Sequence, residues 1–226
     1  MDHEISLGGE TFHYRETGAE DAPPLVLLHA MGEQASDWDD FAAAVADRYR
    51  VLALTQRGHG RSPYSGGYSY ARMCDDLLLF VDALGLATFT VIGHSLGGAV
   101  AIRFAQAHPD RLTRLVLEDV TALRTPREYP PEDRPDFDLP FDWDMLLAMR
   151  AEMATPDLTV VHRMADIAVP TLIIAGGPTS SIPQDQLAEA VERIPHARLA
   201  TIDVGHFVHT EAPAEFLKEV NAFLAE

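Results

Sequence analysis

Short apolar runs alternate with amphipathic stretches along most of the chain. The runs have the continuity of strands that are buried on both faces of a sheet. We predict six such strands, over residues 25–28, 50–54, 89–92, 112–117, 171–175 and 198–202. Residues 4–7 and 11–16, on either side of Gly8-Gly9, predict a hairpin that adds an antiparallel edge to the same sheet.

The stretches between the apolar runs have the period of amphipathic helices. We predict helices over residues 38–46, 70–84, 96–108, 187–194 and 213–224. Gly85 follows the second of these as a C-cap residue, and Pro109 stops the third. Strands that alternate with helices form crossover units of a mostly parallel sheet. The fold class is therefore α/β, with a mostly parallel eight-stranded sheet flanked by helices in a single domain over residues 1–226.

Residues 121–163 interrupt this alternation. The segment holds Pro126, Pro130, Pro131, Pro135 and Pro140 together with many acidic residues, and then a short amphipathic stretch around residues 143–153. We expect an insertion at the edge of the sheet that forms a small lid, within the one domain.

Acidic residues dominate the charge, with 35 Asp and Glu against 17 Lys and Arg and a formal net charge of -18 among 226 residues. This charge argues against nucleic acid and anionic membranes as partners, because both are polyanions. The single cysteine, Cys74, excludes an intramolecular disulfide. No leader pattern or membrane-length apolar run is present, so we expect a cytoplasmic protein, or a mature form whose leader has been cleaved. Nothing in the sequence indicates an oligomeric state.

A serine lies on a glycine-flanked corner between a predicted strand and a predicted helix. Gly93-His94-Ser95-Leu96-Gly97 fits the G-x-S-x-G pattern of a nucleophile elbow, a sharp turn that exposes a serine hydroxyl. Glycines are needed on both sides because side chains there would collide across the turn. The helix that follows would stabilise negative charge beside Ser95. The pattern therefore predicts Ser95 as a nucleophile.

Four motifs in this order resemble those of the α/β-hydrolase superfamily, in its esterase-like serine hydrolase branch. They are L-L-H-A-M-G at 27–32, R-G-H-G-R-S at 57–62, G-H-S-L-G-G at 93–98 and D-V-G-H-F-V-H-T-E-A-P at 203–213. The resemblance covers nearly the whole chain and implies an α/β-hydrolase fold. It departs from the family at Ala30, where a glycine is usual.

The resemblance implies roles for further residues. His206, in a Gly-His-Phe pattern, would be the general base, with His209 as the less favoured alternative. The backbone N–H groups of Met31 and Leu96 would form the oxyanion hole. The ten histidines show no spacing of a closed ligand set, so we expect no metal, and this chemistry needs no cofactor.

The acid of the expected triad is not at its usual place. The family keeps an aspartate after the strand that corresponds to residues 171–175, where this chain has Thr179 and Ser180. Asp119, at the end of the neighbouring strand, is the favoured substitute, and the chain order Ser95, Asp119, His206 keeps the order of the family. Glu118 and Asp203 are lesser candidates, Asp185 is expected in or near the following helix, and a Ser-His dyad is the remaining alternative.

The expected activity is hydrolysis of a carboxylic ester or related acyl bond of a small molecule through an acyl-enzyme. Lactonase, thioesterase, carbon–carbon bond hydrolase and perhydrolase activities fit the same residues, whereas a serine nucleophile argues against dehalogenase and epoxide hydrolase chemistry. The altered acid position also fits a small-ligand-binding protein with slow or no turnover. His29, Trp143 and Met149 are candidate pocket residues.

Overall fold

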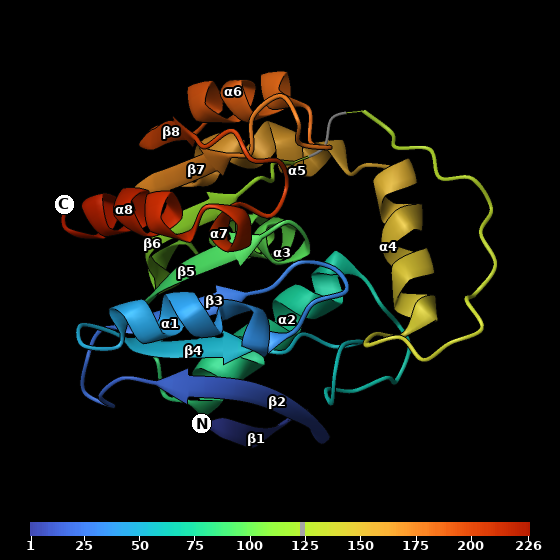
Figure 1. Cartoon of the computed structure of the whole chain (residues 1–226), viewed down its shortest axis with the longest axis horizontal. Helices are drawn as coiled ribbons and strands as arrows, with labels where there is room; N and C mark the ends of the chain where they lie inside the picture. The colour runs from blue at the N-terminus through green and yellow to red at the C-terminus, as the bar shows by residue number, and fades with distance from the viewer. Residues whose placement is uncertain (123–124) are drawn as a thin grey trace.

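A computed structural model describes residues 1–122 and 125–226, and its strands form one mixed sheet (Figure 1). The strand order is β1-β2-β4-β3-β5-β6-β7-β8. The strands are β1 (Asp2–Leu7), β2 (Glu10–Thr17), β3 (Pro24–Leu28), β4 (Arg50–Leu54), β5 (Phe89–His94), β6 (Leu112–Glu118), β7 (Thr171–Ala175) and β8 (Ala197–Thr201). The hairpin β1–β2 is antiparallel and joins β4 antiparallel, whereas the pairs from β4 to β8 are parallel.

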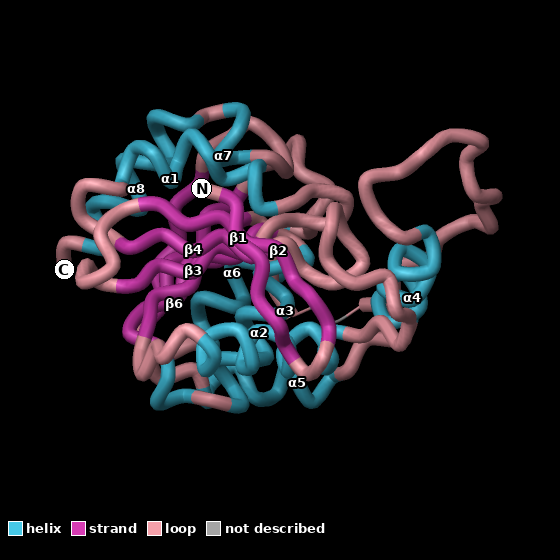
Figure 2. Tube along the Cα trace, turned by 90° about the horizontal axis from the view of Figure 1, so that it is seen from below, coloured by secondary structure: helices cyan, strands magenta, loops and turns pink. Residues whose placement is uncertain are grey.

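Helices cover both faces of this sheet (Figure 2). They are α1 (Asp39–Val45), α2 (Tyr70–Ala83), α3 (Leu96–Ala107), α4 (Trp143–Ala154), α5 (Leu158–His162), α6 (Gln184–Arg193), α7 (Val208–Glu211) and α8 (Pro213–Leu224). One apolar cluster joins α1 and α8 to one face, and a second joins α2, α3 and α6 to the other. The central strands are therefore buried on both sides, which explains their continuous apolar runs. The predicted α/β-hydrolase fold is confirmed.

The observed elements agree closely with those predicted from periodicity. The bounds of β4, β7 and α8 are the predicted ones, and those of the other predicted elements differ by a few residues. The predicted helix over 38–46 begins instead as a 3-10 turn, η1 (Ala35–Trp38), before α1. Two short helices, α5 and α7, and two 3-10 turns, η2 (Pro109–Arg111) and η3 (Arg163–Asp166), were not predicted.

Residues 125–142 form a long connection that leads to α4, which stands beside the carboxyl ends of the strands (Figure 1). Asp142 fastens the start of α4, because its N–H donates to the Gly58 carbonyl at 2.7 Å and its carboxylate accepts from the Tyr68 hydroxyl at 2.6 Å. The Arg127 N–H donates to the Met153 carbonyl at 2.9 Å near the other end. Residues 123 and 124 of the predicted insertion lie outside the described residues. Among the helices that the structure describes, none is long and apolar enough to cross a bilayer.

Candidate active site

Ser95 lies at the turn between β5 and α3 in a backbone conformation that is rare for a residue with a side chain. Its φ is 50° and its ψ is -110°. The turn is held by two hydrogen bonds, from the Ser95 N–H to the Glu118 carbonyl at 3.1 Å and from the Ala99 N–H to the Ser95 carbonyl at 2.9 Å. Such strain persists only where the surroundings fix it, and it is typical of functional sites. The sharp strand-to-helix turn predicted from the G-x-S-x-G pattern is therefore present at Ser95.

The glycines of this elbow, residues 93–97, are required by close backbone contacts. A Cβ on Gly93 would lie 2.6 Å from the carbonyl carbon of Gly97 and from the Cα of Gly98. A Cβ on Gly97 would lie 2.6 Å from the carbonyl carbon of Leu28, at the end of β3. Backbone atoms form these contacts and cannot rotate away, so a larger residue would open the turn.

Ser95, Leu96 and Met31 line one cavity of about 50 Å³. Leu96 is the first residue of α3, so its N–H has no carbonyl one turn earlier in the helix to bond. The loop after β3 is joined to the elbow by a 3.2 Å hydrogen bond from the Gly97 N–H to the His29 carbonyl. The structure thus brings the two predicted oxyanion-hole residues to the same cavity as Ser95.

His206 follows β8 and lies against Asp119, which follows β6. The His206 Nδ1 is 2.7 Å from the Asp119 Oδ2, with the imidazole side chain 20% exposed and the carboxylate fully buried. His94, the residue before Ser95, contacts the same loop, because its Nε2 lies 2.8 Å from the His206 carbonyl oxygen. The nucleophile candidate and the imidazole therefore lie on neighbouring loops.

The Asp119 carboxylate is fixed by donors on several sides. The Gly176 N–H donates to its Oδ1 at 2.8 Å, and the Ser180 hydroxyl donates to the Oδ2 that faces His206. Burial alone would raise the pKa of Asp119, but the hydrogen bonds from His206, Ser180 and Gly176 outweigh it and lower the pKa. Asp119 itself has a φ of 44°, a left-handed conformation that Asp and Asn tolerate better than most residues. The carboxylate is therefore charged and fixed beside the ring.

The other candidate carboxylates do not contact His206 in this way. Asp185 is exposed on α6, and Asp203 is exposed after β8. Glu118 binds His209 instead, with its two oxygens 2.9 and 2.8 Å from the ring Nδ1. Ser180, which lies where the sequence comparison with the family expected the acid, donates instead to Asp119.

A buried polar cluster, not expected from the sequence, lies behind the elbow. Asp37, His94 and His209 each place one atom that could bind a metal within 4.8 Å of the others. The His209 Nε2 is 3.2 Å from the Asp37 Oδ2, and the Trp38 ring stacks on the His209 ring at 4.1 Å. Only the folded chain reveals this grouping, because Asp37, His94 and His209 are distant in sequence.

The wall of the cavity at Ser95 is mostly apolar. It is formed by Met31, Tyr70, Ser95, Leu96, Ala99, Val120, Thr121, Arg127, Met153 and Ile182. The candidate pocket residues His29, Trp143 and Met149 are not part of this wall. Trp143 and Met149 are buried on the face of α4 that packs inward, whereas Met153, one turn further on, reaches the cavity. The His29 ring is fully buried and accepts the Gln56 N–H through Nε2 at 2.9 Å.

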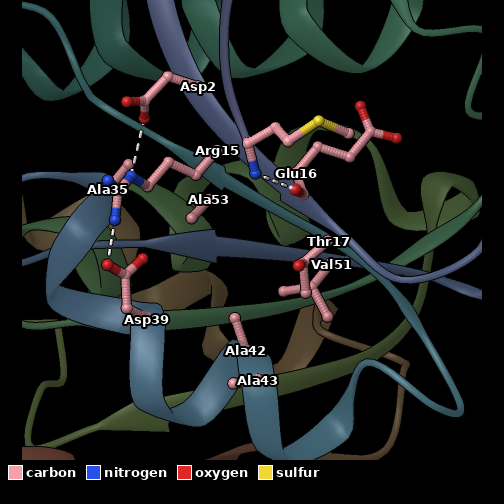
Figure 3. Close-up of a pocket in the computed structure, with 11 residues that line it drawn as sticks. Asp2, Arg15, Glu16, Thr17, Ala35, Asp39, Ala42, Ala43, Val51 and Ala53 are labelled. Atoms are coloured by element: carbon pink, nitrogen blue, oxygen red, sulfur yellow. Dashed lines mark hydrogen bonds and ion pairs between the residues drawn. The ribbon is translucent and has the colours of Figure 1, made fainter.

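A larger cavity, of about 260 Å³, is lined by residues of β1, β2, η1, α1 and β4 (Figure 3). Arg15 crosses it and pairs with Asp2 at 2.8 Å and with Asp39. The Met1 amino group donates to the Glu16 carbonyl at 2.7 Å. Arg15 thus has its partners within the cavity wall, the Glu16 carboxylate pairs with Arg50 outside it, and Ser95, Asp119 and His206 are not among its lining residues.

Residues 23–147 match the protein family described as alpha/beta hydrolase fold. The chain is 26% identical to the mouse (Mus musculus) sn-1-specific diacylglycerol lipase ABHD11, with 90% of this chain and 81% of that protein covered. It is 29% identical to the putative carbamate hydrolase RutD of Pseudomonas savastanoi pv. phaseolicola, over 90% of this chain and 94% of that protein.

A solved structure of a hydrolase from Pseudomonas aeruginosa PA01 has the same architecture. It superimposes with a TM-score of 0.87 at 27% identity, and the match covers 100% of this chain and 98% of that one. The similarity therefore includes the loops that carry Ser95, Asp119 and His206.

Proposed function

The chain belongs to the α/β-hydrolase family, and from this premise we propose that it is a serine hydrolase that cleaves a carboxylic ester or related acyl bond. The observation that carries the proposal is the strained Ser95 turn at the N-terminus of α3, next to the 2.7 Å contact between His206 and Asp119. Ser95 is the nucleophile, His206 the general base and Asp119 the acid of the triad.

The proposed reaction starts with proton transfer from the Ser95 hydroxyl to His206. The Asp119 carboxylate accepts the Nδ1–H of His206, which leaves the Nε2 lone pair free to take that proton. Ser95 Oγ then bonds to the acyl carbon, and the negative charge passes to the carbonyl oxygen. The N–H groups of Met31 and Leu96 stabilise this oxyanion, each worth about 3 kcal/mol of barrier.

Collapse of the tetrahedral intermediate releases the alcohol, which takes the proton back from His206. A water molecule, activated by the same imidazole, then attacks the acyl-enzyme and frees the acid and Ser95. The buried Asp119 stabilises the imidazolium that forms in both steps. No step in this scheme requires a cofactor.

We further propose that residues 121–163 act as a lid over the acyl pocket. Thr121, Arg127 and Met153 of this segment line the cavity that contains Ser95. The small volume and apolar wall favour a small or medium acyl group. An ester, a lactone and a thioester all present the same carbonyl to Ser95, so a substrate panel is needed to rank them.

The test is hydrolysis of short p-nitrophenyl esters together with covalent labelling by a fluorophosphonate. The full chain should turn over the ester and carry the probe on the peptide that contains Ser95, and Ser95→Ala should abolish both. Ser65→Ala, an exposed serine outside the cavity, is the matched control and should behave like the wild type. Absence of turnover and labelling in the wild type would favour a ligand-binding protein instead.

A further inference from the structure

Two consecutive acids at the end of β6 each bind one histidine of the short segment formed by residues 206–209, which follows β8. Asp119 binds His206, and Glu118 binds His209. Glu118 is the last residue of β6, and Asp119 follows it with a φ of 44°, so the backbone turns between the two acids and they contact different histidines. The mechanism proposed above uses only the first of these pairs.

Glu118 holds His209 through three hydrogen bonds. It accepts the His209 backbone N–H at 2.8 Å, and its oxygens lie 2.9 and 2.8 Å from the ring Nδ1. The carboxylate is fully buried and the His209 side chain is 3% exposed. Both the backbone and the ring of His209 are therefore fixed relative to β6.

The charges around His209 make it a cation. A fully buried carboxylate such as Glu118 needs a compensating positive charge, and Asp37 adds a second negative charge 3.2 Å from Nε2. Burial opposes the charge on His209, but Glu118 and Asp37 outweigh it and raise its pKa to about 10. The stacked Trp38 ring encloses the imidazolium from one side.

His94 fixes the His206 end of the segment. A carbonyl oxygen can only accept, so the His94 Nε2–H donates to the His206 carbonyl over the 2.8 Å contact. Burial lowers the pKa of His94, which is consistent with this neutral tautomer. The segment is thus attached to the elbow at His206 and to β6 at His209.

We propose that Glu118 and His209 are positioning residues that hold the His206 imidazole in line with Ser95. The proposal rests on the proposed function. The buried pair fixes His209, which lies in the first turn of α7 and three residues after His206, and leaves Asp119 to set the ring orientation. A shift of about 1 Å at His206 is enough to cost about 100-fold in rate, so loss of the pair should act on turnover.

A metal ion bound by Asp37, His94 and His209 is the competing interpretation of this cluster. The ion pairs explain more of the contacts, because the His209 Nδ1 lies 2.8 Å from a Glu118 oxygen and its Nε2 lies at ion-pair distance, 3.2 Å, from the Asp37 Oδ2. They also account for the buried charge of Glu118 without a further cation.

The experiment measures ester hydrolysis by Glu118→Gln and His209→Gln. Each should lower kcat by about 10- to 100-fold with KM nearly unchanged. The double variant E118Q/H209Q replaces the ion pair by two neutral amides and should regain part of kcat relative to either single variant. It also serves as the test if a single variant does not fold.

Asp76→Asn is the matched control, because Asp76 forms another buried ion pair, with Arg57, at 2.5 and 2.7 Å. It should lower Tm and leave kcat per folded molecule unchanged. Variants of Glu118 and His209 that only lower Tm, like this control, would overturn the proposal.

The second readout is a double-mutant cycle that combines His209→Gln with His206→Ala. The measured quantity is the rate of fluorophosphonate labelling of Ser95, which is slow but not zero without His206. If His209 acts through His206, the effect of His209→Gln should disappear in this background. An undiminished effect would overturn the proposal, and so would wild-type activity that a chelator removes and Zn²⁺ restores. Failure of the proposed function is distinguishable, because Ser95→Ala would then leave hydrolysis unchanged.

Discussion

Replacing Asp119 by asparagine should remove most of the turnover while leaving the fold intact. Asparagine has nearly the same shape and tolerates the φ of 44° at this position. Its amide oxygen can still accept the Gly176 N–H, which donates to the Asp119 Oδ1 at 2.8 Å in the wild type. The amide NH₂ then faces the His206 Nδ1, where the carboxylate oxygen stood 2.7 Å away.

The expected loss follows from the tautomer that this geometry imposes. An NH₂ group can only donate, so Nδ1 of His206 must accept and the ring proton moves to Nε2. A protonated Nε2 cannot take the proton of Ser95. By analogy with aspartate-to-asparagine changes in serine protease triads, kcat should fall about 10⁴-fold, or about 5 kcal/mol of barrier.

The assay is p-nitrophenyl ester hydrolysis at saturating substrate, with Tm measured on the same preparations. Asp185→Asn is the control, because Asp185 is an exposed acid on α6, just after the family's usual acid position. It should retain wild-type kcat. If Asp119→Asn keeps kcat within about tenfold of the wild type, or if Asp185→Asn is the more damaging change, the assignment of Asp119 as the acid is refuted.

Three further expectations concern stability and can be checked by thermal and denaturant unfolding. Ser95→Gly should be more stable than Ser95→Ala by about 1–2 kcal/mol, since glycine adopts the φ of 50° without strain, and equal stability would argue against strain at this turn. Gly93→Ala should destabilise by more than about 2 kcal/mol because its Cβ would lie 2.6 Å from backbone atoms of Gly97, and a near-neutral change would show that the turn can relax. His209 has a pKa of about 10, above its ordinary 6.5, so its contribution of up to about 5 kcal/mol is complete below pH 6.5 and lost as pH rises towards 10. The stability difference between the wild type and His209→Gln should shrink over that range, and a constant difference would contradict a charged His209.

The elements that the sequence predicted well are those with enough residues to show a period. β4, β7 and α8 have the predicted bounds because each carries an uninterrupted apolar run or a clear helical face. The helices α5 (Leu158–His162) and α7 (Val208–Glu211) span little more than one turn. A single turn shows no repeat, so periodicity could not reveal them.

The resemblance to the α/β-hydrolase superfamily was enough to suggest Asp119 as a partner of His206, through its place at the end of β6 and the chain order Ser95, Asp119, His206. The catalytic role of the pair remains a prediction. The Ser180 hydroxyl on Asp119 could not be foreseen, since it depends on how the loop after β7 folds back. The pair of Glu118 and His209 joins residues that lie 91 positions apart, and no motif links the two residues in the sequence.

The pocket was the least predictable part of the site. Trp143, Met149 and Met153 lie on α4, whose apolar residues are spread around the helix rather than gathered on one face. Only the position of α4 relative to the sheet decides that Met149 is buried while Met153 lines the cavity that contains Ser95. An apolar side chain suits a protein core as well as a ligand cavity, so the sequence could not distinguish the two.

The contact between Ser180 and Asp119 shows that side chains from the ends of β6 and β7 meet at a single point beside the imidazole. A carboxylate placed on either loop would therefore present its oxygen to the same imidazole nitrogen. The position of that oxygen in space, rather than its place along the polypeptide, decides whether the ring is held.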